Sequence, residues 1–187
     1  MRWTQKLMRE VAVEERTNLG LSQWDQLDPY VLCQEHGIPV YALSEIASSD
    51  AVAHFSVDRA STWSAALIPV GSARLIVEND EHHPVRRRSN IGHELGHFLL
   101  EHDFKTELFG ESHARQFDAK LEKEATFLAG ELLVPFQSVE QMAFKGWTNE
   151  QVALKFGVSE QFAQMRMSGQ RVRAERASVK FRGRRSF

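Results

Sequence analysis

The chain begins with an amphipathic helical pattern. Apolar side chains recur at helical spacing between residues 2 and 15, among them Leu7 and Val11, and this spacing predicts a helix with one face in the core. An Asp-Pro step then predicts a second helix over residues 28–35, with Asp28 as N-cap and Pro29 in the first turn. Both helices are expected to contribute packing rather than chemistry.

Short β-prone runs follow these helices. They cover residues 38–43, 51–57, 63–70 and 73–78 and are separated by Ser/Asp clusters and by a Gly-Ser step. Runs of this length, bounded by turn residues, predict a small, mainly antiparallel sheet. The last run ends immediately before a helical pattern, so the sheet and that helix are expected to be closely coupled.

Helical periodicity dominates the second half of the chain. One helix is predicted from Pro84 to about His102, and another over residues 117–133, where Pro135 stops it. Between them, residues 103–116 are mostly polar and predict a loop. In the second of these helices an apolar stripe includes one carboxylate, Glu124, and burying a carboxylate is costly unless it is paired or bound to a metal.

Residues 148–167 have the pattern of a helix-turn-helix. Thr148 and Gln151 form a capping box, Gly157 makes a turn, and Ser159 caps a second helix that is predicted to end near Met167. Beyond this helix no periodicity predicts an element. We therefore divide the chain into a main α+β domain (1–136), a helix-turn-helix-like region (137–168) and a flexible basic tail (169–187).

Composition fits a domain of ordinary size, because 42% of the 187 residues are hydrophobic. The single cysteine, Cys33, excludes an internal disulfide, and the first residues lack the apolar run of a signal peptide. No apolar stretch is long enough to span a bilayer. We therefore expect a soluble, cytoplasmic protein without a membrane partner.

The net charge of −2 conceals an uneven distribution. Residues 1–165 carry 15 Lys+Arg and 24 Asp+Glu, a balance of −9, whereas residues 166–187 carry 8 and 1, a balance of +7. The basic tail is either a solvated end or a segment that docks on DNA or on a DNA-bound partner.

The sequence His93-Glu94-Leu95-Gly96-His97 carries the strongest chemical signal. Two histidines four residues apart on a helix point the same way, one turn apart, and can bind one metal ion. The glutamate after the first histidine can take a proton from a water held by that metal. The pattern is therefore typical of a zinc hydrolase helix.

A catalytic zinc normally has three protein ligands, so a third must come from elsewhere. A metzincin would have glycine three residues and histidine six residues after His97, but this chain has Leu100 and Asp103 there. Glu124 and Glu131 are the best candidates, because both lie among apolar neighbours on nearly the same helical face. Weaker candidates are His102, which is expected on the helix face opposite the two histidines, and His113, His82, His83 and His54.

The two motif helices together resemble the ImmA/IrrE family of metallo-endopeptidases. The family typically has His-Glu-Leu-Gly-His followed by Glu-Ala-Asn-x-Phe-Ala-Ala-Glu-Leu-Leu-Met-Pro, and this chain has Glu-Ala-Thr-Phe-Leu-Ala-Gly-Glu-Leu-Leu-Val-Pro at 124–135. The similarity covers roughly residues 5–168. Thr126, Leu128 and Gly130 depart from the usual Asn, Phe and Ala, and these changes concern packing more than chemistry.

The resemblance implies a zincin-like fold with a His/His/Glu site. It implies Glu124 rather than Glu131 as the third ligand beside His93 and His97, and Glu94 as the general base. Zn²⁺ is the expected metal, and Mn²⁺ or Fe²⁺ suit the same donors. The implied substrate is a helix-turn-helix repressor of a phage, mobile element or stress regulon, and a strand within 51–57 is a candidate to pair with it.

The competing hypothesis is a non-enzymatic regulator that keeps the metal site and binds DNA or a repressor. It would use the helix pair at 149–167 and the basic tail on phosphates. Against it, the second helix of that pair offers only Arg166 as a cation.

Overall fold

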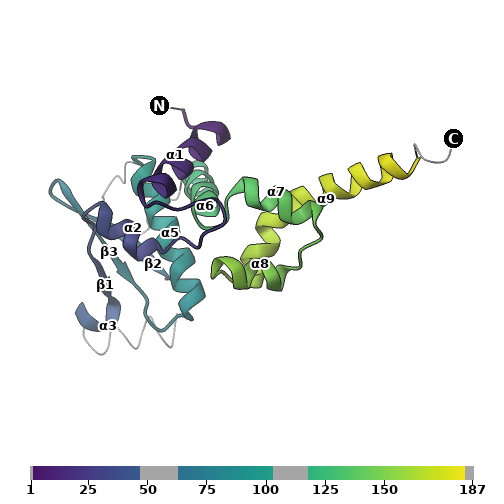
Figure 1. Cartoon of the computed structure of the whole chain (residues 1–187). Coiled ribbons are helices and arrows are strands. Elements are labelled where there is room, and N and C mark those ends of the chain that lie inside the picture. The colour runs from purple at the N-terminus through teal and green to yellow at the C-terminus, as the bar shows by residue number, and fades with distance from the viewer. Residues whose placement is uncertain (1, 47–62, 103–117, 184–187) are drawn as a thin grey trace.

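The computed structural model describes residues 2–46, 63–102 and 118–183 of the chain, and Figure 1 shows their arrangement. The elements are α1 (Gln5–Asn18), α2 (Pro29–Glu35), β1 (Val40–Ala42), α3 (Leu43–Ile46), β2 (Ala65–Val70), β3 (Ala73–Glu78), α5 (Pro84–Leu99), α6 (Ala119–Leu133), α7 (Phe136–Phe144), α8 (Asn149–Phe156) and α9 (Glu160–Gly183). The predicted α+β class is confirmed, whereas the predicted strand at 51–57 and the predicted loop at 103–116 lie outside the described residues.

The sheet of the described residues has three strands in the order β1-β3-β2. β2 and β3 form an antiparallel hairpin whose turn contains Gly71 at φ +60°, a conformation that suits glycine. β1 instead pairs with β3 in parallel, so the prediction of a mainly antiparallel sheet is wrong for this pair. A hairpin signal is local, whereas nothing local in the sequence specifies the neighbour of β1 across the long connection to β3.

Helices α5 and α6 pack against each other beside the sheet (Figure 1). A Cβ at Gly96 would lie 2.6 Å from the carbonyl oxygen of Ala125, and a Cβ at Gly92 would lie 3.9 Å from the Cβ of Ala129. Small residues therefore face one another along an antiparallel pair of helices and let their backbones approach closely. This contact fixes which side chains of α6 reach the histidines of α5.

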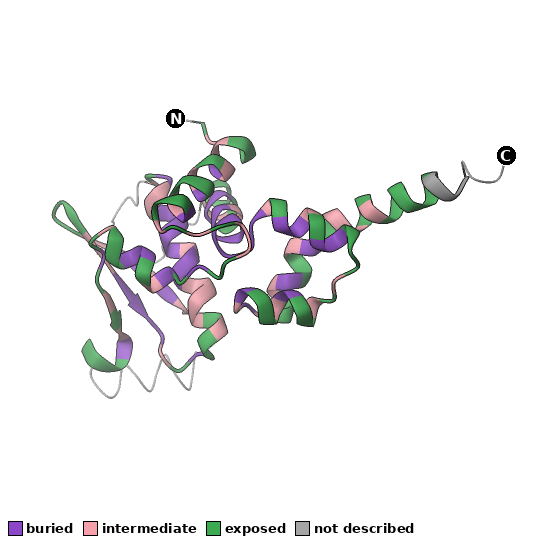
Figure 2. Cartoon of the chain, viewed as in Figure 1, coloured by how far each residue is buried: buried purple, intermediate pink, exposed green. Residues whose placement is uncertain are grey.

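The core lies between the sheet, α5, α6 and the helices that flank them, as the buried positions in Figure 2 show. The predicted apolar stripe of α6 is buried at Ala125, Leu128 and Leu132. α1 packs along α6, and the buried guanidinium of Arg16 donates to the carbonyl oxygen of Leu132. α1 thereby holds the C-terminal end of α6 in place.

The last three helices pack beside this body (Figure 1). The predicted capping box is present at the start of α8, where the Thr148 side chain accepts from the backbone of Gln151 and the Gln151 side chain accepts in return. Gly157 ends α8 in the left-handed conformation at φ +63°. The description of this region as helix-turn-helix-like, and the domain boundaries, stay predictions.

The predicted end of the last helix near Met167 is wrong, because α9 continues to Gly183 and projects from the body (Figure 1). Its outer part is rich in Arg, Lys, Ala, Gln and Glu, which favour helix without needing an apolar face. Periodicity detects only helices that bury one side, so it missed this extension.

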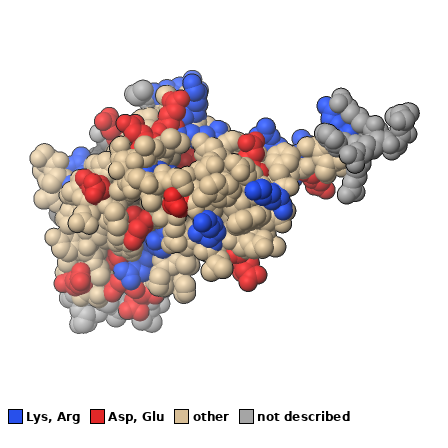
Figure 3. Space-filling model, viewed as in Figure 1, with Lys and Arg blue, Asp and Glu red and all other residues tan. Residues whose placement is uncertain are grey.

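Figure 3 shows acidic side chains spread over the body in the same view. Within the described residues no helix combines the length and apolar character needed to cross a membrane.

Candidate metal centre

His93 and His97 lie one turn apart on α5, as the motif predicts. Their Nε2 atoms are 3.1 Å apart, and the planes of the two rings are inclined by 79°. The side chain of His97 is 2% exposed, whereas that of His93 is 27% exposed. The two imidazoles therefore turn the same ring nitrogen toward a common point at the margin of the core.

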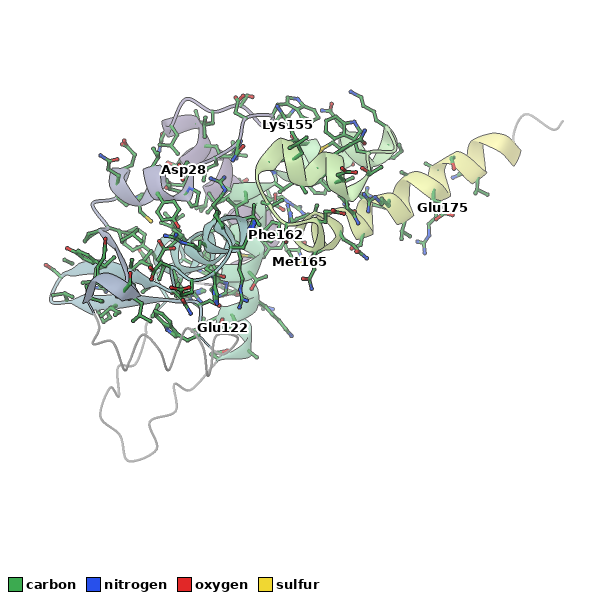
Figure 4. The ribbon with its side chains drawn as sticks, turned by 90° about the horizontal axis from the view of Figure 1, so that it is seen from below. Asp28, Glu122, Lys155, Phe162, Met165 and Glu175 are labelled. Atoms are coloured by element: carbon green, nitrogen blue, oxygen red, sulfur yellow. The ribbon has the colours of Figure 1, made fainter. Side chains whose placement is uncertain are left out.

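The carboxylate that meets these nitrogens belongs to Glu122, near the start of α6 (Figure 4). Its Oε2 lies 3.0 Å from Nε2 of His93, and its Oε1 lies 3.4 Å from Nε2 of His97. Each of the three residues offers one possible metal-ligand atom, and these atoms lie within 4.8 Å of one another. In the described part of the chain they form the candidate metal site, called the three-donor group below. They come from two helices that pack together, so the fold itself assembles the group.

The donor set fits a divalent metal. Two ligand atoms about 2.05 Å from one ion at a tetrahedral angle lie about 3.3 Å apart. The two Nε2 atoms are 3.1 Å apart, and each lies 3.0 or 3.4 Å from one of the two carboxylate oxygens of Glu122. Two imidazoles and one carboxylate are also the donors of many catalytic zinc sites. Geometry and chemistry therefore agree that His93, His97 and Glu122 can hold one ion.

Glu94 follows the first histidine and turns toward the sheet. Its side chain is buried, and its Oε2 accepts a hydrogen bond of 2.8 Å from the backbone N–H of Leu67 on β2. β2 is the edge strand next to α5 among the described strands. The strand thus fixes this carboxylate beside the three-donor group.

His102 contacts His97, and the prediction that it points away from the two motif histidines is wrong. The prediction assumed that α5 continues to His102, but the helix ends at Leu99 and Glu101 takes the left-handed conformation at φ +52°. The N–H of Glu101 then bonds to the Phe98 carbonyl, and the N–H of His102 bonds to the His97 carbonyl, which is the Schellman pattern. This turn brings Nδ1 of His102 to 3.0 Å from Nδ1 of His97.

Glu124 lies next to His102 rather than between the two motif histidines. Its Oε2 is 3.4 Å from Nε2 of His102, and its Oε1 is 3.6 Å from Nζ of Lys120. Burial lowers the pKa of His102 below its usual value, against the opposing effect of Glu124. The predicted role of Glu124 as third ligand stays a prediction, and Glu122 is the carboxylate that the structure brings to both rings.

The other candidate ligands have different partners. Glu131 is buried and binds Arg166 at 3.0 Å, Arg9 at 3.3 Å and the backbone N–H of Phe136 at 3.0 Å. This carboxylate ties together α1, α6, α7 and α9 and is not part of the three-donor group. His82 lies 3.4 Å from Asn90, and His83 caps α5, whereas His54 and His113 fall outside the described residues.

Sequence reasoning missed Glu122 because it searched for carboxylates inside the apolar stripe. Glu122 is 31% exposed and lies at the edge of that stripe. The small residues Ala125 and Ala129 could have identified it, because they face the glycines of α5. Glu122 lies on the same face of α6, about one turn before Ala125, and therefore also faces α5. Thr126, four residues after Glu122, also reaches the site with its Oγ1 3.4 Å from Nδ1 of His93.

This arrangement is that of a metallopeptidase-like domain. Comparison with protein families agrees, because the model of a peptidase family described as the IrrE N-terminal-like domain matches residues 33–168. The chain therefore belongs to the ImmA/IrrE family of metallopeptidases. No curated protein and no solved structure matches it significantly.

Proposed function

We propose that this protein is a zinc-dependent endopeptidase that cleaves a helix-turn-helix transcriptional repressor and so relieves repression of a phage, mobile-element or stress regulon. The single observation that supports it best is the three-donor group of His93, His97 and Glu122, beside the buried carboxylate of Glu94. Membership of a peptidase family supports the reaction class.

The proposed metal ligands are Nε2 of His93, Nε2 of His97 and the carboxylate of Glu122. A bound Zn²⁺ supplies Lewis acidity, which polarises a peptide carbonyl and lowers the pKa of water toward neutrality. Glu124 is the alternative third ligand from the family resemblance. In the present geometry it would first have to leave His102 and Lys120.

Glu94 is the proposed general base. The N–H of Leu67 orients its carboxylate, and burial excludes competing solvent hydrogen bonds. Glu94 takes a proton from the attacking water and passes it to the leaving amine, a role that contributes about 10²–10⁴-fold in rate. Because a backbone amide holds Oε2, the carboxylate keeps its direction while its protonation changes.

β2 supports a role in substrate binding. It lies at the edge of the described sheet and passes directly beside Glu94 through Leu67. An extended peptide that adds to such an edge by backbone hydrogen bonds would run past the general base. The identity of the substrate as a repressor rests on the family resemblance.

The alternative function is a non-enzymatic DNA-binding or repressor-binding regulator. If this regulator bound DNA bases through the second helix of the 149–167 pair, Arg166 would be the cation available to contact them. That side chain is 12% exposed and binds Glu131 and, through Nε at 3.1 Å and a terminal nitrogen at 2.8 Å, the Val134 carbonyl. Arg166 is therefore committed within the molecule, which favours the peptidase.

The test is co-expression with the repressor encoded beside this gene. The wild type should produce a discrete cut, and Glu94→Gln should abolish it while metal content and repressor binding remain. Glu81→Gln, at an exposed position before α5, is the matched control and should cleave normally. Derepression that persists unchanged in Glu94→Gln without any cut would reject the peptidase and favour the sequestering regulator.

A further inference from the structure

His102 lies behind His97, on the side opposite the three-donor group. In an imidazole the two nitrogens point outward on different sides of the ring. Nε2 of His97 meets His93 and Glu122, and Nδ1 of His97 meets Nδ1 of His102 at 3.0 Å. Each nitrogen of His97 therefore has a defined neighbour.

The contact between the two Nδ1 atoms permits two tautomeric arrangements, because one nitrogen must donate and the other accept. If Nδ1 of His102 donates, then neutral His97 carries its proton on Nε2, and that atom cannot bind a metal. If Nδ1 of His97 donates, its Nε2 keeps a lone pair directed toward His93 and Glu122. The tautomer of His102 thus decides whether His97 is a ligand.

The environment of Nε2 of His102 selects between the two. This nitrogen is buried, has no hydrogen bond within the described part of the chain, and lies 3.4 Å from Oε2 of Glu124. A carboxylate attracts an N–H and repels a lone pair, so the contact with Glu124 places a proton of His102 on Nε2. Nδ1 of His102 is then an acceptor.

We propose that His102 is a positioning residue that accepts the Nδ1–H of His97, with Glu124 fixing the acceptor tautomer, so that Nε2 of His97 is held ready for the metal. The inference rests on the proposed function, since it concerns the same ion. Hydrogen bonds of this kind orient ligand histidines and raise their basicity.

The backbone that carries His102 is strained in a way that agrees with this role. Glu101 adopts φ +52°, which costs a residue other than glycine about 1–2 kcal/mol. Glycine is the usual residue at such a helix end. The conformation places His102 beside His97 instead of continuing the helix, and it buries the ring to 3% exposure.

The test measures Zn²⁺ affinity by competition with a chromophoric chelator, together with the visible absorption of the Co²⁺-substituted protein. His102→Leu fills a similar volume but removes the acceptor Nδ1. His102→Asn instead places a carbonyl oxygen, also an acceptor, near the position of Nδ1. The matched control is His36→Ala, because His36 also binds a carboxylate, Glu15 at 2.8 Å, but is not among the three donors. Urea unfolding of the metal-free variants reports folding separately.

His102→Leu should weaken Zn²⁺ binding about 10–100-fold, the usual effect of losing an outer hydrogen-bond partner, and should change the Co²⁺ spectrum. His102→Asn should recover most of the affinity, and His36→Ala should match the wild type. Wild-type affinity in His102→Leu, or equal losses in the Leu and Asn variants, would overturn the inference. A wild type that binds no metal would instead overturn the proposed function, and the inference with it.

Discussion

Gly96 sets the distance between the two helices that carry the metal donors. A Cβ added there would lie 2.6 Å from the carbonyl oxygen, 3.0 Å from Cα and 3.1 Å from the carbonyl carbon of Ala125. All three atoms are backbone, so no side chain can rotate away. Restoring ordinary contact at 3.4 Å requires α5 and α6 to separate by about 0.8 Å.

Gly96→Ala should therefore act on both stability and metal binding. Overpacking of this kind costs about 1–3 kcal/mol, and the gain in helix propensity from glycine to alanine returns about 1 kcal/mol. The expected net loss in the free energy of unfolding is therefore about 0–2 kcal/mol. A separation of 0.8 Å also exceeds the ~0.2 Å tolerance of ligand distances, so Zn²⁺ affinity should fall clearly.

Gly92→Ala is the matched control on the same helix. Its added Cβ would meet Cδ1 of Leu133 at 3.2 Å, the end of a flexible side chain that can give way. This variant should be as stable as the wild type or more stable, by up to about 1 kcal/mol. Both variants would be compared by urea unfolding and zinc titration. If Gly96→Ala equalled Gly92→Ala in stability and in metal affinity, the close approach of α5 and α6 would not control the site.

Three further predictions concern single side chains. Glu122→Gln should abolish tight Zn²⁺ binding. Glu124→Gln keeps a hydrogen-bond acceptor for the ring of His102 and should retain most of the Zn²⁺ affinity. Competition with a chelator measures both affinities, and the opposite ranking would make Glu124 the ligand. Burial, aided by nearby carboxylates, raises the pKa of Cys33 to about 12. The neutral, buried thiol therefore contributes fully to the free energy of unfolding below about pH 8.5, the pKa in the unfolded chain. This contribution is lost as pH rises from there through the folded pKa. Between pH 8 and pH 10 the wild type should therefore lose about 1–2 kcal/mol more than Cys33→Ala in urea unfolding, and equal losses would contradict the burial argument. Arg166→Gln should lower the free energy of unfolding by about 1.5–3 kcal/mol, because it weakens the charged contacts of buried Glu131. Binding of duplex DNA should not change. A large loss of DNA affinity without destabilisation would show that this arginine reads DNA.

Local signals predicted local structure well. The Asp-Pro step placed α2, whose bounds are Pro29–Glu35, and the run before Asn79 placed β3 at Ala73–Glu78. The capping box placed the start of α8. In each case a few adjacent residues supply the hydrogen bond or the dihedral angle that fixes the element, so the sequence pattern is sufficient.

The site was predictable only in part. The motif placed His93, Glu94 and His97 on one helix, because their relation depends on helical spacing alone. The position of His102 depends on Glu101 taking a left-handed conformation without being glycine, for which the sequence has no signal. The approach of Glu122 depends on small residues of two distant helices matching each other, which periodicity within either helix does not reveal.

The hydrogen bond from Leu67 to Glu94 has a consequence for how the protein can change. The donor is main chain, so every amino acid except proline would supply it at position 67. Under the proposed function, substitutions along β2 could therefore change which peptides bind to the strand without changing the orientation of the Glu94 carboxylate. The proposal therefore implies that substrate preference and acid–base chemistry can evolve separately on this scaffold.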